Sequence, residues 1–147
     1  MLKVTVLAKL IIIGIMIATL SYFSYWGYEW VVYVLSRAFA VVTEFNFFDM
    51  LVGLIAMISS IPLFIGSFMA WRANANSVLW ITIGSIGFTV KNVLEISSSV
   101  YVLSLLETVF YTDVQFAAQD IGVQLFQIAL WIFVLFYFKK LADTKPA

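Results

Sequence analysis

Long uninterrupted apolar runs constrain this chain more than any other feature. Four of them cover residues 4–24, 47–71, 78–106 and 117–138. About 20 apolar residues suffice for a helix to cross the roughly 30 Å hydrocarbon core of a bilayer. Because no Pro/Gly/Ser-rich linker divides the sequence, we predict a single all-α membrane domain over residues 1–147, a bundle of four transmembrane helices.

The N-terminal run begins with the positive charges of Lys3 and Lys9. A cleavable signal peptide also has a basic start followed by an apolar stretch. The run is long for a signal, and the small residues after it, Ala18, Ser21 and Ser24, make a poor cleavage pattern. We therefore expect a membrane anchor.

Residues 28–44 predict an amphipathic helix. Polar or small residues recur there at spacings of three and four, which places them on one helical face. These residues are Glu29, Tyr33, Ser36, Arg37, Ala40, Thr43 and Glu44. We expect the helix to lie on the outer membrane surface or against the bundle, and a short fifth span is the alternative.

Composition supports a membrane protein and narrows its chemistry. The chain is 64% hydrophobic and 11% charged, whereas a soluble domain is about one-quarter charged. Its formal net charge is zero and it has no basic tract, so we expect the lipid bilayer and no nucleic acid among its partners.

The sequence contains neither histidine nor cysteine. The chain by itself therefore offers no ligands for haem, blue copper, iron–sulfur or the usual zinc sites, and no histidine-based nucleophilic machinery. We expect no cofactor, no metal and no enzyme activity of the chain alone. If it serves a catalytic complex, another chain carries the reactive centre.

Charged residues sort to two sides when the chain is threaded through four spans. The cations of one side are Lys3, Lys9, Arg72, Lys139, Lys140 and Lys145. The charged residues of the other side are Glu29, Glu44, Asp49, Glu107, Asp113 and the lone cation Arg37. Lys and Arg in short loops favour the cytoplasm, so we predict a multi-pass plasma-membrane protein with both termini cytoplasmic.

Two charged residues, Lys91 and Glu95, stand near the middle of the third span. A charge at that depth costs about 2.5–3.5 kcal/mol on insertion scales, so neither residue is expected to face lipid. Their spacing of four allows them to pair with each other. Gly84 and Gly87 share this face and would let a neighbouring helix approach closely.

The fourth span has a matching polar stripe. If the third and fourth spans run antiparallel, Asp120 lies near Glu95, Gln124 near the depth of Asn92, and Gln127 near Lys91. We predict that the two faces meet as an intramembrane polar seam, formed by Lys91, Asn92, Glu95, Ser98, Asp120, Gln124 and Gln127.

Three interpretations of this seam remain open. It is a set of structural contacts that fixes helix register, here called packing glue, or a site for a proton, an ion or a polar ligand, or a docking face for another subunit. A lysine and a glutamate one turn apart neutralise each other, which favours packing glue.

A pattern of aromatic, glycine and charged residues precedes and enters the third span. It consists of Ala70-Trp71-Arg72, a polar turn, then Val78 to Gly84, Gly87-Phe88 and Glu95. By this pattern, residues 65–138 resemble a family of small archaeal membrane proteins. The resemblance implies a four-helix membrane architecture of uncharacterised function and no activity. Lys91 departs from the family's pattern.

We therefore expect a non-catalytic integral membrane subunit or scaffold that packs within a larger membrane complex. By analogy of size and hydrophobicity, that complex would be of the respiratory or monooxygenase type. The alternative is a small transporter, channel or membrane sensor that uses the polar seam.

Overall fold

The computed structural model describes residues 4–38, 47–105 and 111–143, and the regular elements there are α-helices. They are α1 (Val6–Ala38), α2 (Phe47–Trp71), α3 (Ser77–Leu105) and α4 (Tyr111–Asp143). With 33, 25, 29 and 33 residues, they are about 50, 38, 44 and 50 Å long. All four are long and apolar enough to cross a membrane, so the predicted all-α fold with four such helices is confirmed.

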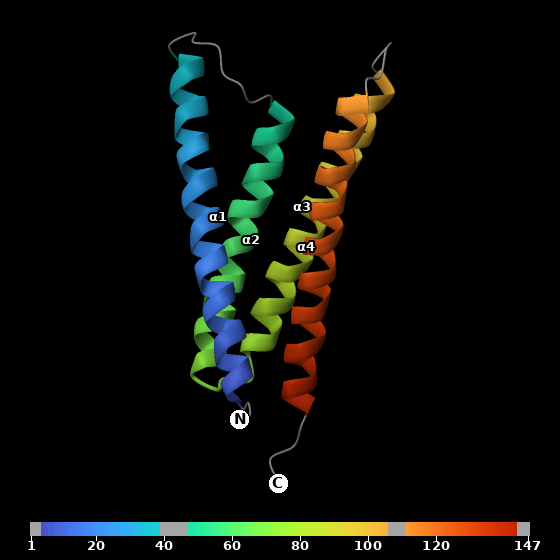
Figure 1. Ribbon diagram of the computed structural model, residues 1–147. Helices are drawn as coiled ribbons and strands as arrows, with labels where there is room; N and C mark the ends of the chain where they lie inside the picture. The colour runs from blue at the N-terminus through green and yellow to red at the C-terminus, as the bar shows by residue number, and fades with distance from the viewer. Residues whose placement is uncertain (1–3, 39–46, 106–110, 144–147) are drawn as a thin grey trace.

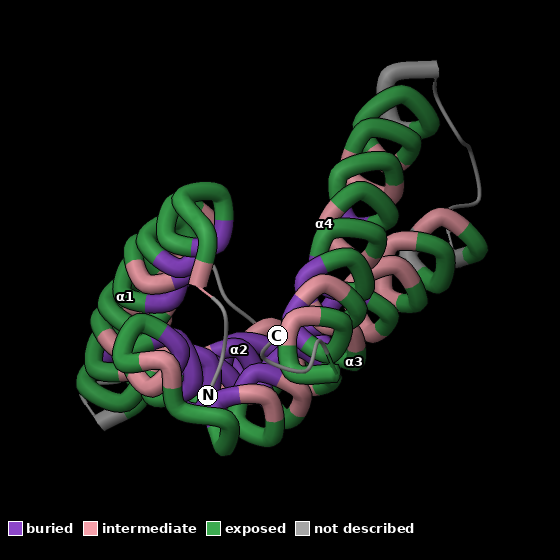
Figure 2. Tube along the Cα trace, turned by 90° about the horizontal axis from the view of Figure 1, so that it is seen from below, coloured by how far each residue is buried: buried purple, intermediate pink, exposed green. Residues whose placement is uncertain are grey.

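The helices form a curved row in chain order (Figures 1 and 2). Within the described residues, Cα atoms of different helices come within 8 Å only between α1 and α2, α2 and α3, and α3 and α4. Viewed end-on in Figure 2, α2 and α3 form the middle of the arc and carry much of its buried surface. The concave face of the row therefore lies between α1 and α4.

The two ends of the row differ. The first described residues and the end of α4 lie at one end, here called the terminal end, and the other ends of α1 and α4 lie at the distal end (Figure 1). Towards the terminal end, Ile12 and Ile15 of α1 belong to the same buried cluster as Trp131 and Phe138 of α4. The Thr5 and Tyr137 hydroxyls lie 3.5 Å apart. Towards the distal end the α1 and α4 ribbons diverge.

Glycines bring α2 and α3 close together. A Cβ added to Gly84 would lie 2.9 Å from both the Leu63 nitrogen and the Ser59 carbonyl oxygen of α2. Gly66 makes the reciprocal approach to α3, where its Cβ would lie 2.8 Å from the Ile81 nitrogen. Small residues permit such backbone-to-backbone packing, which fixes the position of α3 against α2.

A short polar turn joins α2 to α3, as the sequence predicts. Ala73 adopts a positive φ of 57°, and the Asn74 N–H reaches back to the Met69 carbonyl at 3.0 Å. This is the hydrogen-bonding pattern of a Schellman helix end, in which glycine is the usual residue with positive φ. The Asn74 side-chain oxygen accepts from the Asn76 N–H at 2.9 Å, just before α3 begins.

The predicted amphipathic helix over residues 28–44 is not seen as a separate element. Residues 28–38 continue α1 without interruption, and residues 39–44 lie outside the described part of the chain. Within this continuous helix the Trp30 indole N–H donates to the Met50 carbonyl of α2 at 3.1 Å, which holds the segment against α2. Val31 and Val34 of this segment are 58% and 54% exposed, whereas Ser36 is buried, so its apolar side faces outward.

The fourth predicted span, residues 117–138, is shorter than the helix that contains it. α4 extends to Tyr111 at one end and Asp143 at the other. Lys139 and Lys140 mark the expected membrane boundary but do not end the helix, because lysine is a good helix former.

We predict that Gly84→Ala weakens the α2–α3 contact by about 1–3 kcal/mol, because the helices must separate to admit the methyl group. Gly122→Ala on α4 is the matched control, because no atom of the described residues lies within 4 Å of a Cβ there. It should leave stability unchanged or raise it by up to about 1 kcal/mol through helix propensity. Thermal unfolding of both variants in one detergent measures the difference, and equal effects would contradict the packing described.

Candidate functional site

A buried ion pair on α3 is the centre of the polar residues. The Lys91 ammonium lies 2.5 Å from a Glu95 carboxylate oxygen. Lys91 is 4% exposed and Glu95 is 23% exposed, so the lysine lies deeper in the protein. The same ammonium donates to the Asn92 side-chain oxygen at 3.3 Å and lies 5.8 Å from the centre of the Tyr22 ring. A carboxylate, an amide oxygen and an aromatic face together compensate the removal of this cation from water.

Asp120 links α4 to α3 through Ser99, which lies one helical turn beyond Glu95 towards the distal end. Its carboxylate accepts a hydrogen bond from the Ser99 hydroxyl at 2.7 Å. The Gln124 amide of the same helix donates to the other oxygen of Asp120 at 3.4 Å. Counting residues from the helix ends placed Asp120 beside Glu95; in the structure its α3 hydrogen-bond partner is Ser99, and the predicted Ser98 lines the adjoining cleft.

Gln127 is hydrogen-bonded to a residue of α1. Its side-chain oxygen accepts from the Tyr22 hydroxyl at 3.3 Å. The ring of the same tyrosine lies 5.8 Å from the Lys91 ammonium, so Tyr22 connects Gln127 with Lys91. Sequence analysis missed Tyr22; the available signal was a phenol deep in an apolar run, where its hydroxyl needs a partner.

Two amides near this ion pair have unpaired atoms. The Asn92 side-chain nitrogen and the Gln124 side-chain oxygen are buried and have no hydrogen-bond partner in the described structure. Asn92 is fully buried and Gln124 is 7% exposed. An unpaired buried polar atom costs about 1–3 kcal/mol, so each of these atoms has unused capacity to bind a further group.

A cleft of about 460 Å³ opens beside these residues. It lies on the concave side of the row and is bordered by all four helices. Its polar lining consists of Asp49, Glu95, Ser98, Ser99, Asp120 and Gln124. The remaining wall is apolar, formed by Trp26, Phe48 and Val52. The described lining thus holds three carboxylates and no lysine or arginine.

The cleft extends from the distal end into the interior. Asp49 lies in the first turn of α2 at the distal end. Gln124 lies 13 residues beyond Tyr111, the first residue of α4, which corresponds to about 20 Å along the helix. The cleft therefore extends from the first turn of α2 to the level of the ion pair.

Aromatic rings border the cleft on the side that faces the terminal end. The Tyr22 and Phe88 ring centres lie 5.0 Å apart, edge to face, and the Phe88 and Trp131 rings stack at 4.9 Å. These three rings come from α1, α3 and α4, and Phe88 and Trp131 are buried. They form an apolar floor between the polar cleft and the terminal end.

A second cavity, of about 400 Å³, lies between α1 and α4 towards the terminal end. Its lining includes Gly14, Ala18, Leu130 and Phe133, so it is mainly apolar. Nothing lies within 4 Å of a Cβ at Gly14, which leaves the α1 side of this groove open.

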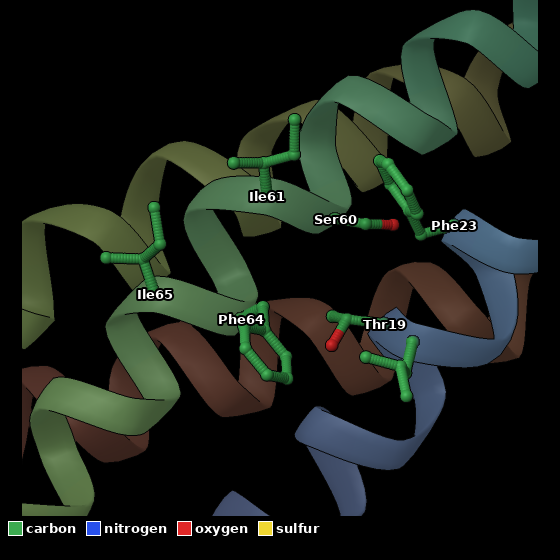
Figure 3. Close-up of a pocket in the computed structure, with 7 residues that line it drawn as sticks. Thr19, Phe23, Ser60, Ile61, Phe64 and Ile65 are labelled. Atoms are coloured by element: carbon green, nitrogen blue, oxygen red, sulfur yellow. The ribbon is translucent and has the colours of Figure 1, made fainter. Parts of the chain in front are cut away.

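A third pocket lies between α1 and α2, and both of its polar side chains already have hydrogen-bond partners (Figure 3). Its polar side chains are Thr19 and Ser60. The Thr19 hydroxyl bonds to the Ile15 carbonyl at 2.9 Å, and the Ser60 hydroxyl bonds to the Ala56 carbonyl at 2.8 Å. Both hydroxyls are satisfied by their own helices, so this pocket is an apolar surface groove.

Within the described residues, no three Asp or Glu side chains lie close enough together to hold a metal ion. The carboxylates of the cleft are distributed over α2, α3 and α4 instead. They can attract positive charge without forming a coordination shell.

Comparisons with known proteins returned no family model, no curated protein and no solved structure that matches this chain. The resemblance to small archaeal membrane proteins stays a prediction from sequence.

We predict that Glu95→Met is more damaging than the double change Lys91→Met/Glu95→Met. The single variant leaves a buried ammonium without its carboxylate, which should cost about 3 kcal/mol. The double variant removes both charges and should recover most of that loss. Thermal unfolding of the two proteins in detergent tests the order, and a double variant less stable than the single one would contradict it.

Proposed function

We propose that this chain is a non-catalytic integral membrane subunit, and that another transmembrane element packs against its concave face within a larger complex. One observation carries the proposal. The cleft beside Glu95 and Asp120 lies between α1 and α4, whose Cα atoms nowhere approach within 8 Å in the described residues. The row of helices is thus open where its polar side chains gather.

The depth of the ion pair explains why this opening matters. If Trp80 marks the membrane boundary near the terminal end, Lys91 lies 11 residues farther, about 16 Å into a core of about 30 Å. Glu95 then lies at about 22 Å. Charged groups at such depths are stable when protein or water surrounds them, and costly when lipid chains reach them. A further helix against the concave face would exclude lipid.

The apolar groove below the cleft supports the same arrangement. Gly14 and Ala18, spaced by four residues on α1, present little side-chain bulk to the open side. Small residues with this spacing allow close packing between membrane helices. Leu130 and Phe133 of α4 provide the opposite apolar wall.

The kind of complex is proposed by analogy. The chain lacks the histidine and cysteine ligands that redox centres usually require. A respiratory or monooxygenase-type assembly, in which another chain holds the reactive centre, fits a subunit of this size.

A transporter, channel or sensor is the second candidate, and the polar cleft favours it. A volume of about 460 Å³, lined by carboxylates and reaching the distal end, is large enough for a small ligand. In this role, movement of α1 relative to α4 would open or close the groove below the aromatic floor.

We further propose that the protein lies in the plasma membrane with both termini in the cytoplasm. Lys9, Arg72, Lys139 and Lys140 belong to the terminal end of the row, and Lys9 lies 5.4 Å from the centre of the Trp71 ring. Arg37 lies in the last turn of α1, at the distal end. This excess of cations at one end supports a cytoplasmic terminal end.

We predict that a photoreactive side chain at Leu130 forms cross-links to a second polypeptide in native membranes. Leu130 lines the groove on the concave face and is 44% exposed. Val93 of α3, which is 49% exposed, is the matched control at a surface position outside the described pockets. Mass analysis of the adducts would identify the partner as another protein or a second copy.

Equal cross-linking at both positions, or none at Leu130, would contradict the proposed assembly. Purification in mild detergent provides an independent check, because a subunit should migrate with its partner and not as a lone chain.

A further inference from the structure

We propose that the cleft beside Glu95 and Asp120 is a binding site for the primary ammonium group of a small organic cation. The inference goes beyond the subunit role and holds whether or not another chain completes the row. It combines the charge of the cleft, an unpaired buried acceptor and an apolar wall.

Charge is the first argument. The described lining holds the carboxylates of Asp49, Glu95 and Asp120 and no cationic side chain. Lys91 pairs with Glu95, and the described partners of Asp120 are two neutral groups, Ser99 and Gln124. The low dielectric of helix walls strengthens the field of such carboxylates and favours a cation in the cleft.

The unpaired side-chain oxygen of Gln124 identifies the kind of cation. Gln124 lines the cleft, is 7% exposed, and its oxygen has no donor in the described structure. The amide nitrogen of the same group donates to Asp120 at 3.4 Å, so the free oxygen and the carboxylate are neighbours. A primary ammonium carries three N–H donors and can serve both acceptors at once. A quaternary ammonium has no N–H donor and would leave Gln124 unsatisfied.

The apolar wall favours an organic ligand over a metal ion. Trp26, Phe48 and Val52 border the same space, and aromatic rings attract cations and pack against alkyl chains. The cleft, at about 460 Å³, is much larger than a bare ion requires. No three carboxylates of the described chain are grouped closely enough to coordinate a metal.

The access route is from the distal side. Asp49 lies in the first turn of α2, at the mouth of the cleft, and Gln124 lies deeper. The rings of Tyr22, Phe88 and Trp131 close the far side. A cation that enters the cleft beside the first turn of α2 can thus reach Asp120.

Titration calorimetry of the full chain in zwitterionic lipid nanodiscs tests this assignment. The probe is n-butylamine at neutral pH, where its nitrogen is protonated. Tetramethylammonium has the same charge without an N–H donor. We expect butylammonium to bind at least about tenfold more tightly than tetramethylammonium, since only the former can donate to Gln124 and Asp120.

Two variants locate the site. Asp120→Asn should weaken butylammonium binding about 10- to 100-fold, because it removes a charged acceptor. Gln124→Met keeps the side-chain length, removes the unpaired oxygen without changing charge, and should weaken binding by about tenfold. Asp143→Asn, at the exposed terminal end of the same helix, is the matched control and should leave affinity unchanged.

Equal binding of the two cations would overturn the assignment, because it would show a general attraction of positive charge. Absence of butylammonium binding, tighter binding of Ca²⁺ at the same residues, or equal effects of Asp120→Asn and Asp143→Asn would do so as well. Loss of binding when a co-purified partner remains attached would show that the partner fills the cleft, which also contradicts a ligand site. The cross-linking result at Leu130 is independent of all these outcomes.

Discussion

The contact between the Lys91 ammonium and the Glu95 carboxylate determines what the rest of the structure must provide. An ammonium that is 4% exposed, in the middle of an apolar helix, needs its counter-charge and further acceptors nearby. Glu95 supplies the counter-charge. The neighbouring Asn92 accepts a hydrogen bond, and the Tyr22 ring of α1 lies close to the ammonium. Because α1 helps to surround Lys91, the first and third helices are linked although their backbones are not in contact. The hydrogen bond between Ser99 and Asp120 then connects these polar residues of α3 to α4.

This arrangement divides the molecule into two halves along the helices. Towards the terminal end, aromatic and aliphatic side chains line the apolar groove between α1 and α4. The rings of Tyr22, Phe88 and Trp131 separate this groove from the polar residues. Towards the distal end the α1 and α4 ribbons diverge (Figure 1). The cleft with Asp49, Glu95 and Asp120 lies on this open side of the row. A membrane protein with a polar level on an open face requires protein or water there. The proposed partner helix and the proposed ammonium ligand are two ways to meet this requirement.

Sequence patterns predicted the contacts within single helices and missed the contribution of Tyr22 from α1. The spacing of four residues is enough to pair Lys91 with Glu95 and Gln124 with Asp120, because helix geometry alone brings them together. Counting residues along α3 and α4 indicated that Asp120 lies near Glu95, and both line the same cleft. It could not specify that Ser99 donates to Asp120, because a count of residues does not fix side-chain directions. The periodicity of polar residues indicates which face of a helix is polar, but not how many other helices cover that face. A bundle was therefore expected, and the open row was not. The continuation of α1 through residues 28–38 was missed because polar and small residues spaced by three and four there are typical of a separate surface helix.

The whole account requires that four helices cross a membrane with the cation-rich end inside. The chain has no native cysteine, so single cysteines introduced at Arg37, Arg72 and Lys139 are unique labelling sites. Labelling of intact cells with a membrane-impermeant maleimide should modify the cysteine at position 37, and those at positions 72 and 139 should react only after permeabilisation. Labels that place positions 72 and 139 on opposite sides, or recovery of the protein in the soluble fraction without detergent, would contradict the account.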